Sequence, residues 1–243
     1  MPETDIRELV EVEFTKLSKS VETIQPLLEL INLWRLLGYG LLLLAFLDIL
    51  EIFIPPNFMN PNWEFQTMGR LVNQVAVPLI GILFVFSGKL AKRAKWEPRI
   101  LALLSHLTLL VGLLFILLIP LGVVNTIRLY NSNIEQIHAD YNQKVTQANQ
   151  VEQQFSQASP TDIDNFLKRQ GRSIAGKNPE ELKNQVLSEV TQAKQQLKKQ
   201  TEANKSSTTL VLLKNSVKWN IGALISAALF ISIWKETLWA RKR

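Results

Sequence analysis

Four ionisable side chains lie in apolar or helical surroundings, where they could carry chemistry: Asp48, Glu51, His106 and His138. Asp48 and Glu51 are three residues apart, so a helix would place both carboxylates on one face. A carboxylate inside a membrane is costly without a partner, and it often marks an ion or proton pathway. The pair has two interpretations: an ion or proton site, or a structural pair near the membrane interface.

Polar residues on the next apolar stretch offer partners for these carboxylates. They fall at the same membrane depth as Asp48 and Glu51 if the two stretches are antiparallel, which favours the structural interpretation. The predicted intramembrane polar cluster is Asp48, Glu51, Arg70, Asn73 and Gln74. The alternative is a small transporter or channel-like subunit that uses Asp48, Glu51 and His106.

Other signals of catalysis or ligand binding are missing. The chain has no cysteine, and its two histidines lie in unrelated segments, which disfavours a metal site. No glycine-rich phosphate loop and no HExxH motif occurs. His138 is the remaining candidate base, and its helical neighbours Glu135 and Tyr141 indicate a solvated face. We therefore predict no enzyme activity and no cofactor. The scattered basic residues predict no nucleic-acid partner.

The surrounding elements are apolar blocks separated by polar ones, which is the pattern of an integral membrane protein. Residues 100–124 carry no charge and would form a helix about 37 Å long, enough to cross a bilayer. Similar stretches at 36–54, 71–87 and 217–234 predict three more spans. The predicted fold is an all-α, four-span helical membrane protein with an extracytoplasmic helical hairpin and an N-terminal amphipathic helix.

The predicted domains follow these blocks. They are a cytoplasmic amphipathic helix (1–35), three transmembrane helices (36–124) with an interfacial loop (55–70) and a basic cytoplasmic loop (88–99), a lumenal or periplasmic hairpin (125–216), and a fourth transmembrane helix with a basic cytoplasmic tail (217–243).

Two apolar surfaces outside the spans are predicted to bind a protein partner. The first is a heptad seam in residues 1–35, which Pro26 should kink or divide. Acidic residues opposite this seam favour packing on protein, with the membrane surface as the alternative. The second is the tip of the hairpin. The predicted partner-binding residues are Val10, Phe14, Leu17, Val21, Ile163, Phe166 and Leu167.

Local signals set the ends of the extramembrane helices. Asn60 before Pro61 predicts a capped helix start, as does Asn178 before Pro179. Apolar stripes predict that residues 130–157 and 179–205 pack as an antiparallel pair, although so thin a seam predicts marginal stability without a partner. Aromatic residues at the span ends are expected to anchor in the lipid headgroup zone: Phe58, Trp63, Phe65, Trp219 and Trp239.

Several local motifs also resemble a known family. They are Gly38-Tyr39-Gly40, the run from Asp48 to Pro56, Phe58-Met59-Asn60-Pro61, Trp63-Glu64-Phe65-Gln66, Val77-Pro78-Leu79-Ile80-Gly81 and the run from Leu118 to Asn125. Together they resemble the cyanobacterial HpsJ-like membrane proteins, best over residues 36–130. The resemblance implies an accessory protein linked to polysaccharide production and secretion, in a thylakoid or plasma (inner) membrane. It supplies no catalytic motif. The apolar spans predict contact with membrane lipids, and the amphipathic helices predict a protein partner in a membrane complex, with a homo-oligomer as a further possibility.

The distribution of basic residues predicts the topology. Five lie in residues 88–99, whereas residues 55–70 contain only Arg70, so both termini should face the cytoplasm. Protease added to right-side-out vesicles should therefore cut near Arg169 and Lys177. Protection of that region, with cleavage between Lys92 and Lys95, would reverse the assignment.

Overall fold

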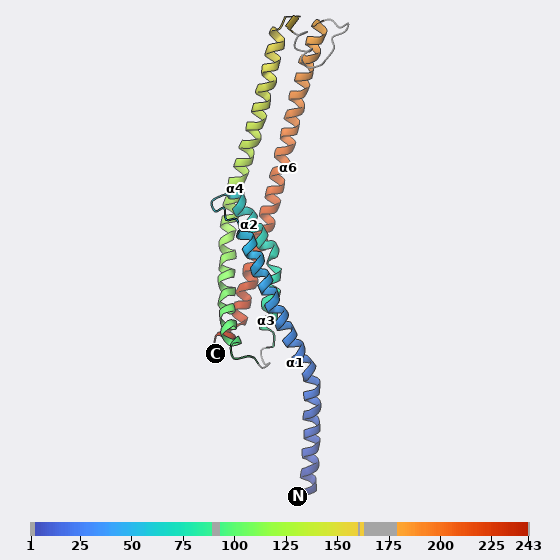
Figure 1. Cartoon of the computed structure of the whole chain (residues 1–243), viewed down its shortest axis with the longest axis vertical. Coiled ribbons are helices and arrows are strands. Elements are labelled where there is room, and N and C mark those ends of the chain that lie inside the picture. The colour runs from blue at the N-terminus through green and yellow to red at the C-terminus, as the bar shows by residue number, and fades with distance from the viewer. Residues whose placement is uncertain (1–2, 89–92, 160, 163–178, 243) are drawn as a thin grey trace. The chain divides into compact units, whose positions relative to one another are not determined.

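A computed structural model describes residues 3–88, 93–159, 161–162 and 179–242 (Figure 1). Its helices are α1 (Glu3–Phe53), α2 (Pro61–Gln74), α3 (Ala76–Phe86), α4 (Glu97–Gln157), α6 (Pro179–Glu236) and α7 (Leu238–Arg241). The described residues contain no strand, so the all-α prediction is confirmed.

The chain forms two compact units, and the division between them falls within α4 and α6. The bundle unit consists of residues 1–125 and 216–243, and the hairpin unit of residues 126–215.

Three helices contain stretches long and apolar enough to cross a membrane. These are Glu29–Phe53, Glu97–Gln157 and Lys183–Glu236. The pair formed by α2 and α3 would be a fourth span if it is counted as one, because the two helices meet at a bend of 41°. The helices of the described chain are therefore consistent with a membrane protein.

Residues 71–87, predicted as one span, do not form one continuous helix. Instead α2 starts at Pro61, ends at Gln74, and is separated from α3 by Val75. Pro78 explains the break, because it lacks the N–H that would donate to the carbonyl of Gln74, and its ring crowds that carbonyl. The hydrogen bonding resumes one residue later, where the Leu79 amide donates to the Val75 carbonyl at 3.2 Å.

α1 is one continuous helix of 51 residues, so of the two predicted effects of Pro26, a kink or a division, division does not occur. The amphipathic segment and the first apolar stretch thus share one helix. The predicted seam residues Val10, Phe14, Leu17 and Val21 lie on this helix, but their side chains are outside the described residues.

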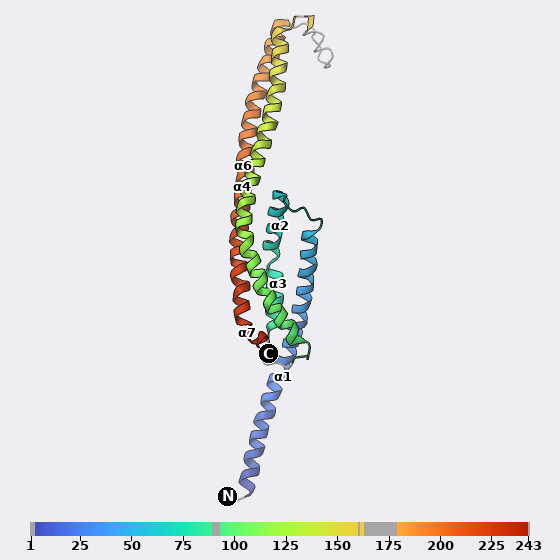
Figure 2. The same cartoon turned by 90° about the vertical axis from the view of Figure 1, so that its left-hand side faces the viewer.

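In the bundle unit α1 packs closely on α3, as both Figure 1 and Figure 2 show. The contact is made backbone to backbone at Gly38 and Gly81. A methyl group on Gly38 would lie 2.8 Å from both the Gly81 carbonyl oxygen and the Val85 nitrogen. Only glycine fits at position 38 without moving the helices apart.

α4 and α6 pack in the same unit through small and aromatic residues. A methyl group on Gly112 would lie 2.9 Å from Ile231, and Ala227 is fully enclosed nearby. The rings of Phe115 and Phe230 stack with centroids 5.9 Å apart. Small residues thus allow the close approach that aromatic packing then stabilises.

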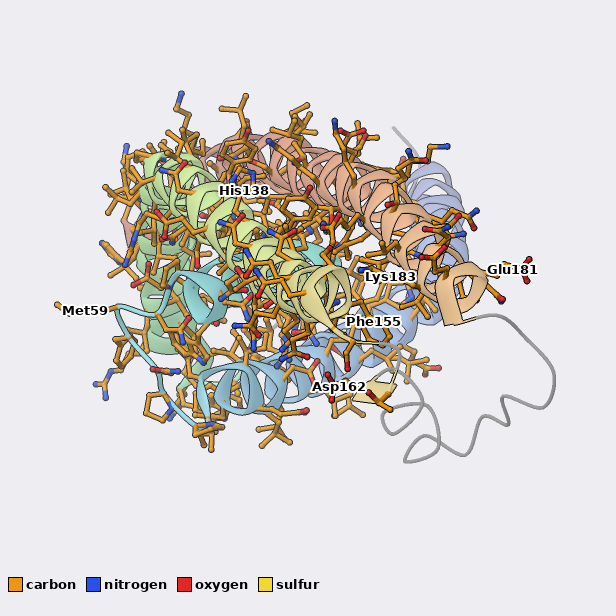
Figure 3. All side chains as sticks on the ribbon, turned by 90° about the horizontal axis from the view of Figure 1, so that it is seen from above. Met59, His138, Phe155, Asp162, Glu181 and Lys183 are labelled. Atoms are coloured by element: carbon orange, nitrogen blue, oxygen red, sulfur yellow. The ribbon has the colours of Figure 1, made fainter. Side chains whose placement is uncertain are left out.

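The hairpin unit is an antiparallel pair made from the second part of α4 and the first part of α6 (Figures 1 and 2). Its apolar seam on α4 is the predicted stripe, which is buried or half-buried at every position: Ile134, Ile137, Tyr141, Val145, Ala148, Val151 and Phe155. Phe155, labelled in Figure 3, is buried and packs against Val186 and Leu187 of α6.

The facing seam on α6 is more polar than predicted. Ala193 is exposed, and the half-buried neighbour is Lys194, whose ammonium pairs with Glu152. Lys183 is also half-buried and donates to the Ser156 carbonyl at 2.7 Å. Lysine stems therefore cover positions where a stable helix pair normally has leucine or isoleucine.

A capping motif follows α4. The Ser159 hydroxyl accepts from the Asp162 amide at 3.4 Å, and the Asp162 carboxylate accepts from the Ser159 amide at 3.3 Å. The Asp162 carboxylate also accepts from the Ser159 hydroxyl at 2.6 Å. This bond, and next the one from the Ser159 amide, lower the pKa of Asp162, so the motif is favoured above that pKa and lost as the pH falls through it. The predicted tip residues Ile163, Phe166 and Leu167 lie outside the described residues.

The two glycines of Gly38-Tyr39-Gly40 provide a matched test of the α1–α3 contact. Gly38→Ala should destabilise the protein by about 1–3 kcal/mol, because the methyl group meets backbone atoms that cannot yield. Gly40→Ala should be neutral or stabilise by up to about 1 kcal/mol, because nothing lies within 4 Å of the new methyl group. Thermal unfolding in one detergent measures both, and equal melting temperatures would contradict the packing.

Candidate functional site

A buried ionic cluster lies at one end of the bundle unit and consists of Arg35, Arg93 and Glu97. Arg35 comes from α1, Arg93 from the loop after α3, and Glu97 is the first residue of α4. The Glu97 carboxylate lies 3.8 Å from the guanidinium of Arg35 and 3.5 Å from that of Arg93. The two arginine side chains are only 6% and 5% exposed, so water screens the pairs weakly.

Both arginines also complete the end of α3. Arg93 donates to the carbonyls of Val85 and Ser87 at 3.4 and 3.0 Å, and Arg35 donates to that of Gly88 at 3.1 Å. Carbonyls at a helix C-terminus lack helical partners and carry partial negative charge, whereas the first turn of α4 favours the Glu97 carboxylate. The cluster therefore complements the ends of two helices.

The same end is closed by aromatic side chains and by α7. The Arg93 guanidinium lies 5.3 Å from the centre of the Trp239 ring, whose edge meets Phe86. Burial, and next the charge of Arg35, lower the pKa of Arg93, while Glu97 acts in the opposite direction. Arginine has so high an ordinary pKa that the group stays charged at neutral pH.

A second polar site lies at the other end of the bundle unit. Asn60 caps α2 as predicted, accepting from the amides of Asn62 and Trp63 at 3.0 and 3.3 Å. The Glu64 carboxylate accepts from the Met59 amide at 3.0 Å and from the buried Asn125 side chain at 2.7 Å. These bonds attach the loop between α1 and α2 to α4.

The five predicted aromatic anchors have different environments. Phe58 is exposed and meets the half-buried Trp63 edge to face, with ring centres 5.0 Å apart. Trp239 is half-buried beneath Arg93. Phe65 and Trp219 are core residues instead, only 3% and 7% exposed, with ring centres 4.5 Å apart. The small Gly69 explains this correction, because it lets the indole of Trp219 lie against α2.

The predicted polar cluster around Asp48 does not form. Asp48 and Gln74 line one cavity, but Glu51, Arg70, Asn73 and Gln74 have exposed side chains. Among the described residues, no hydrogen bond or ion pair joins either carboxylate to Arg70, Asn73 or Gln74. Asp48 and Gln74 share one cavity wall, but α2 ends at Gln74, and Val75 separates it from α3, the helix that packs closely on α1.

The histidines do not assemble with these acids. His106 is exposed in a shallow groove of leucines and bonds to its own helix, with Nδ1 2.7 Å from the Ala102 carbonyl. It does not line the cavity that contains Asp48, so the trio of the transport alternative is not brought together. His138 and Glu135 are exposed on α4. No group of three potential metal ligands occurs in the described part of the chain.

A family model described as HpsJ-like protein matches residues 29–238. The chain belongs to the HpsJ-like family. The match continues well past residue 130, where the motif resemblance is weaker, and it includes the hairpin of this HpsJ-like protein. No curated protein and no solved structure matches the chain.

Removing the one carboxylate of the buried ionic cluster tests its role. Glu97→Gln leaves two buried guanidinium groups without a counter-charge and should cost about 3 kcal/mol of unfolding free energy. Glu236→Gln, at an exposed position near the end of α6, should stay within about 0.5 kcal/mol. Chemical unfolding in one detergent compares them, and equal stability would show that the pairs contribute nothing.

Proposed function

We propose that this HpsJ-like protein is a non-enzymatic accessory or scaffold subunit that binds a partner membrane complex through its extramembrane helices. In this proposal four spans place both termini in the cytoplasm and the hairpin on the opposite side. The membrane is a thylakoid or plasma membrane, and the family resemblance connects the complex with polysaccharide production or secretion.

The observation that carries the proposal is the half-polar seam of the hairpin unit. Lys183 and Lys194 occupy seam positions on α6. Among the described apolar residues of the hairpin end around residues 151–187, only Phe155 is buried. Such a seam removes little apolar surface from water, while ordering two long polar helices opposes folding. Helices of this kind gain order when a partner covers them.

Co-purification tests this function. The tagged full-length protein, extracted in mild detergent from its native membranes, should elute with a partner at a fixed ratio measured by mass spectrometry. Replacing Phe166 and Leu167 with serine should lower partner recovery at least tenfold without changing membrane insertion. Gln154→Ser, at an exposed position of α4, is the matched control and should leave recovery unchanged.

Other outcomes would move or remove the docking site. Normal recovery with the serine variant, combined with loss on deletion of residues 1–30, would assign docking to the N-terminal part of α1. Elution as a bare homo-oligomer under every mild extraction condition would reject the accessory role and favour the transport alternative.

A further inference from the structure

An apolar cavity of about 450 Å³ lies within the bundle unit. Its walls come from α1, from both sides of the α2–α3 break, from α4, and from Phe230 of α6. Val75 and Pro78 line it, so the bend that Pro78 causes also opens the space. Ala45, a small buried residue, leaves the facing part of α1 without a bulky side chain.

The cavity lies along the apolar surface of the bundle unit. Five of its lining residues are large apolar side chains with exposed surface: Phe46, Ile49, Phe53, Leu107 and Leu114. In a membrane these side chains face hydrocarbon rather than water. A ligand that reaches the cavity past them therefore comes from the lipid phase.

The length of the cavity matches one leaflet of a bilayer. The lining runs from Leu42 to Phe53 on α1 and from Leu104 to Phe115 on α4. Eleven residue steps of a helix extend about 17 Å. Half of the hydrocarbon core is about 15 Å, which is the depth that the acyl chains of one leaflet occupy.

We propose that this cavity binds one acyl chain of a bilayer glycerolipid, from the leaflet on the side of the α1–α2 loop. The site rests on the membrane insertion in the proposed function, but not on the partner. The walls suit a hydrocarbon chain. Thr108, one of the few polar residues on them, already donates to the Ser105 carbonyl at 2.7 Å.

Charge favours an esterified chain over a free fatty acid. At the loop end of α1, Asp48 lines the cavity and Glu51 lies one turn further, against a single base, Arg70, on α2. The carboxylate of a fatty acid would meet these like charges, whereas an ester end of the chain carries none. The expected ligand is therefore a glycerolipid with its headgroup beyond Phe53.

Filling the cavity tests the proposal. The full-length protein, washed extensively in detergent, should retain about one glycerolipid per chain by native mass spectrometry. Val111→Trp places a large side chain in the cavity wall and should lower retention at least tenfold. Leu103→Trp is the control, because Leu103 is 68% exposed on the same helix and outside the cavity. Ala45→Leu is a gentler filling variant if Val111→Trp does not fold.

A photoreactive lipid locates the chain. Phosphatidylcholine with a diazirine on one acyl chain, in phosphatidylcholine vesicles that contain the protein, should crosslink within residues 42–53 or 104–115. Unlabelled phosphatidylcholine should compete, and oleate should compete at least tenfold less well.

Three results would overturn the lipid site. The first is equal lipid retention by the filling variants and by Leu103→Trp. The second is lipid crosslinks spread evenly over the lipid-facing helices. The third is a protein–protein crosslink that places a second copy of the chain in the cavity. Each variant should still sediment with the membranes, which excludes failed insertion as the cause of lost lipid. Each should also still recover the partner, so that loss of the lipid site is distinguished from failure of the accessory function.

Discussion

The bundle unit depends on the ion pairs of Glu97 with Arg35 and Arg93. Through them α1, the end of α3, and the start of α4 meet at one point, and Trp239 of α7 covers it. Two long apolar helices side by side in hydrocarbon have little to fix their register, because lipid solvates them as well as protein does. A directional buried ionic contact supplies that register. It sets Leu42 level with Leu104, and so fixes which residues face each other along the cavity.

Glycine and proline supply the remaining constraints on this unit. Gly38 and Gly81 bring α1 and α3 into backbone contact near the ionic cluster, while Pro78 bends the α2–α3 pair further along. Where α1 and α3 pack closely, the helices leave no space, but at the bend the α2–α3 pair no longer follows the neighbouring helices and a space remains. The space between them is the cavity, whose shape follows from Gly38, Gly81 and Pro78, of which only Pro78 lines it.

The sequence predicted the elements better than their contacts. Apolar stretches located the candidate spans, and Asn60 before Pro61 predicted a helix cap that the structure contains. The cap predicted at Asn178 lies outside the described residues. Burial was harder, because Phe65 and Trp219 resemble interfacial anchors until Gly69 brings them together. The predicted partners of Asp48 were also wrong, because that prediction paired residues 36–54 with one antiparallel span at 71–87, whereas the structure breaks this segment at Val75. A proline three residues into an apolar run was the available signal for that break.

The number of basic residues in a loop predicts the topology, whereas the tertiary structure shows which of these residues are buried in ion pairs. Arg93 counts as one positive charge of a short loop, yet in the structure it is buried against Glu97 and the end of α3. Burial of Arg93 against Glu97 does not alter the predicted topology, because the positive-inside rule depends on lysine and arginine during insertion and gives little weight to acids. Lys95 and Arg99 remain exposed near the same end, while the loop between α1 and α2 has no base. Arg93 thus counts toward the predicted topology and also joins the end of α3 to the start of α4.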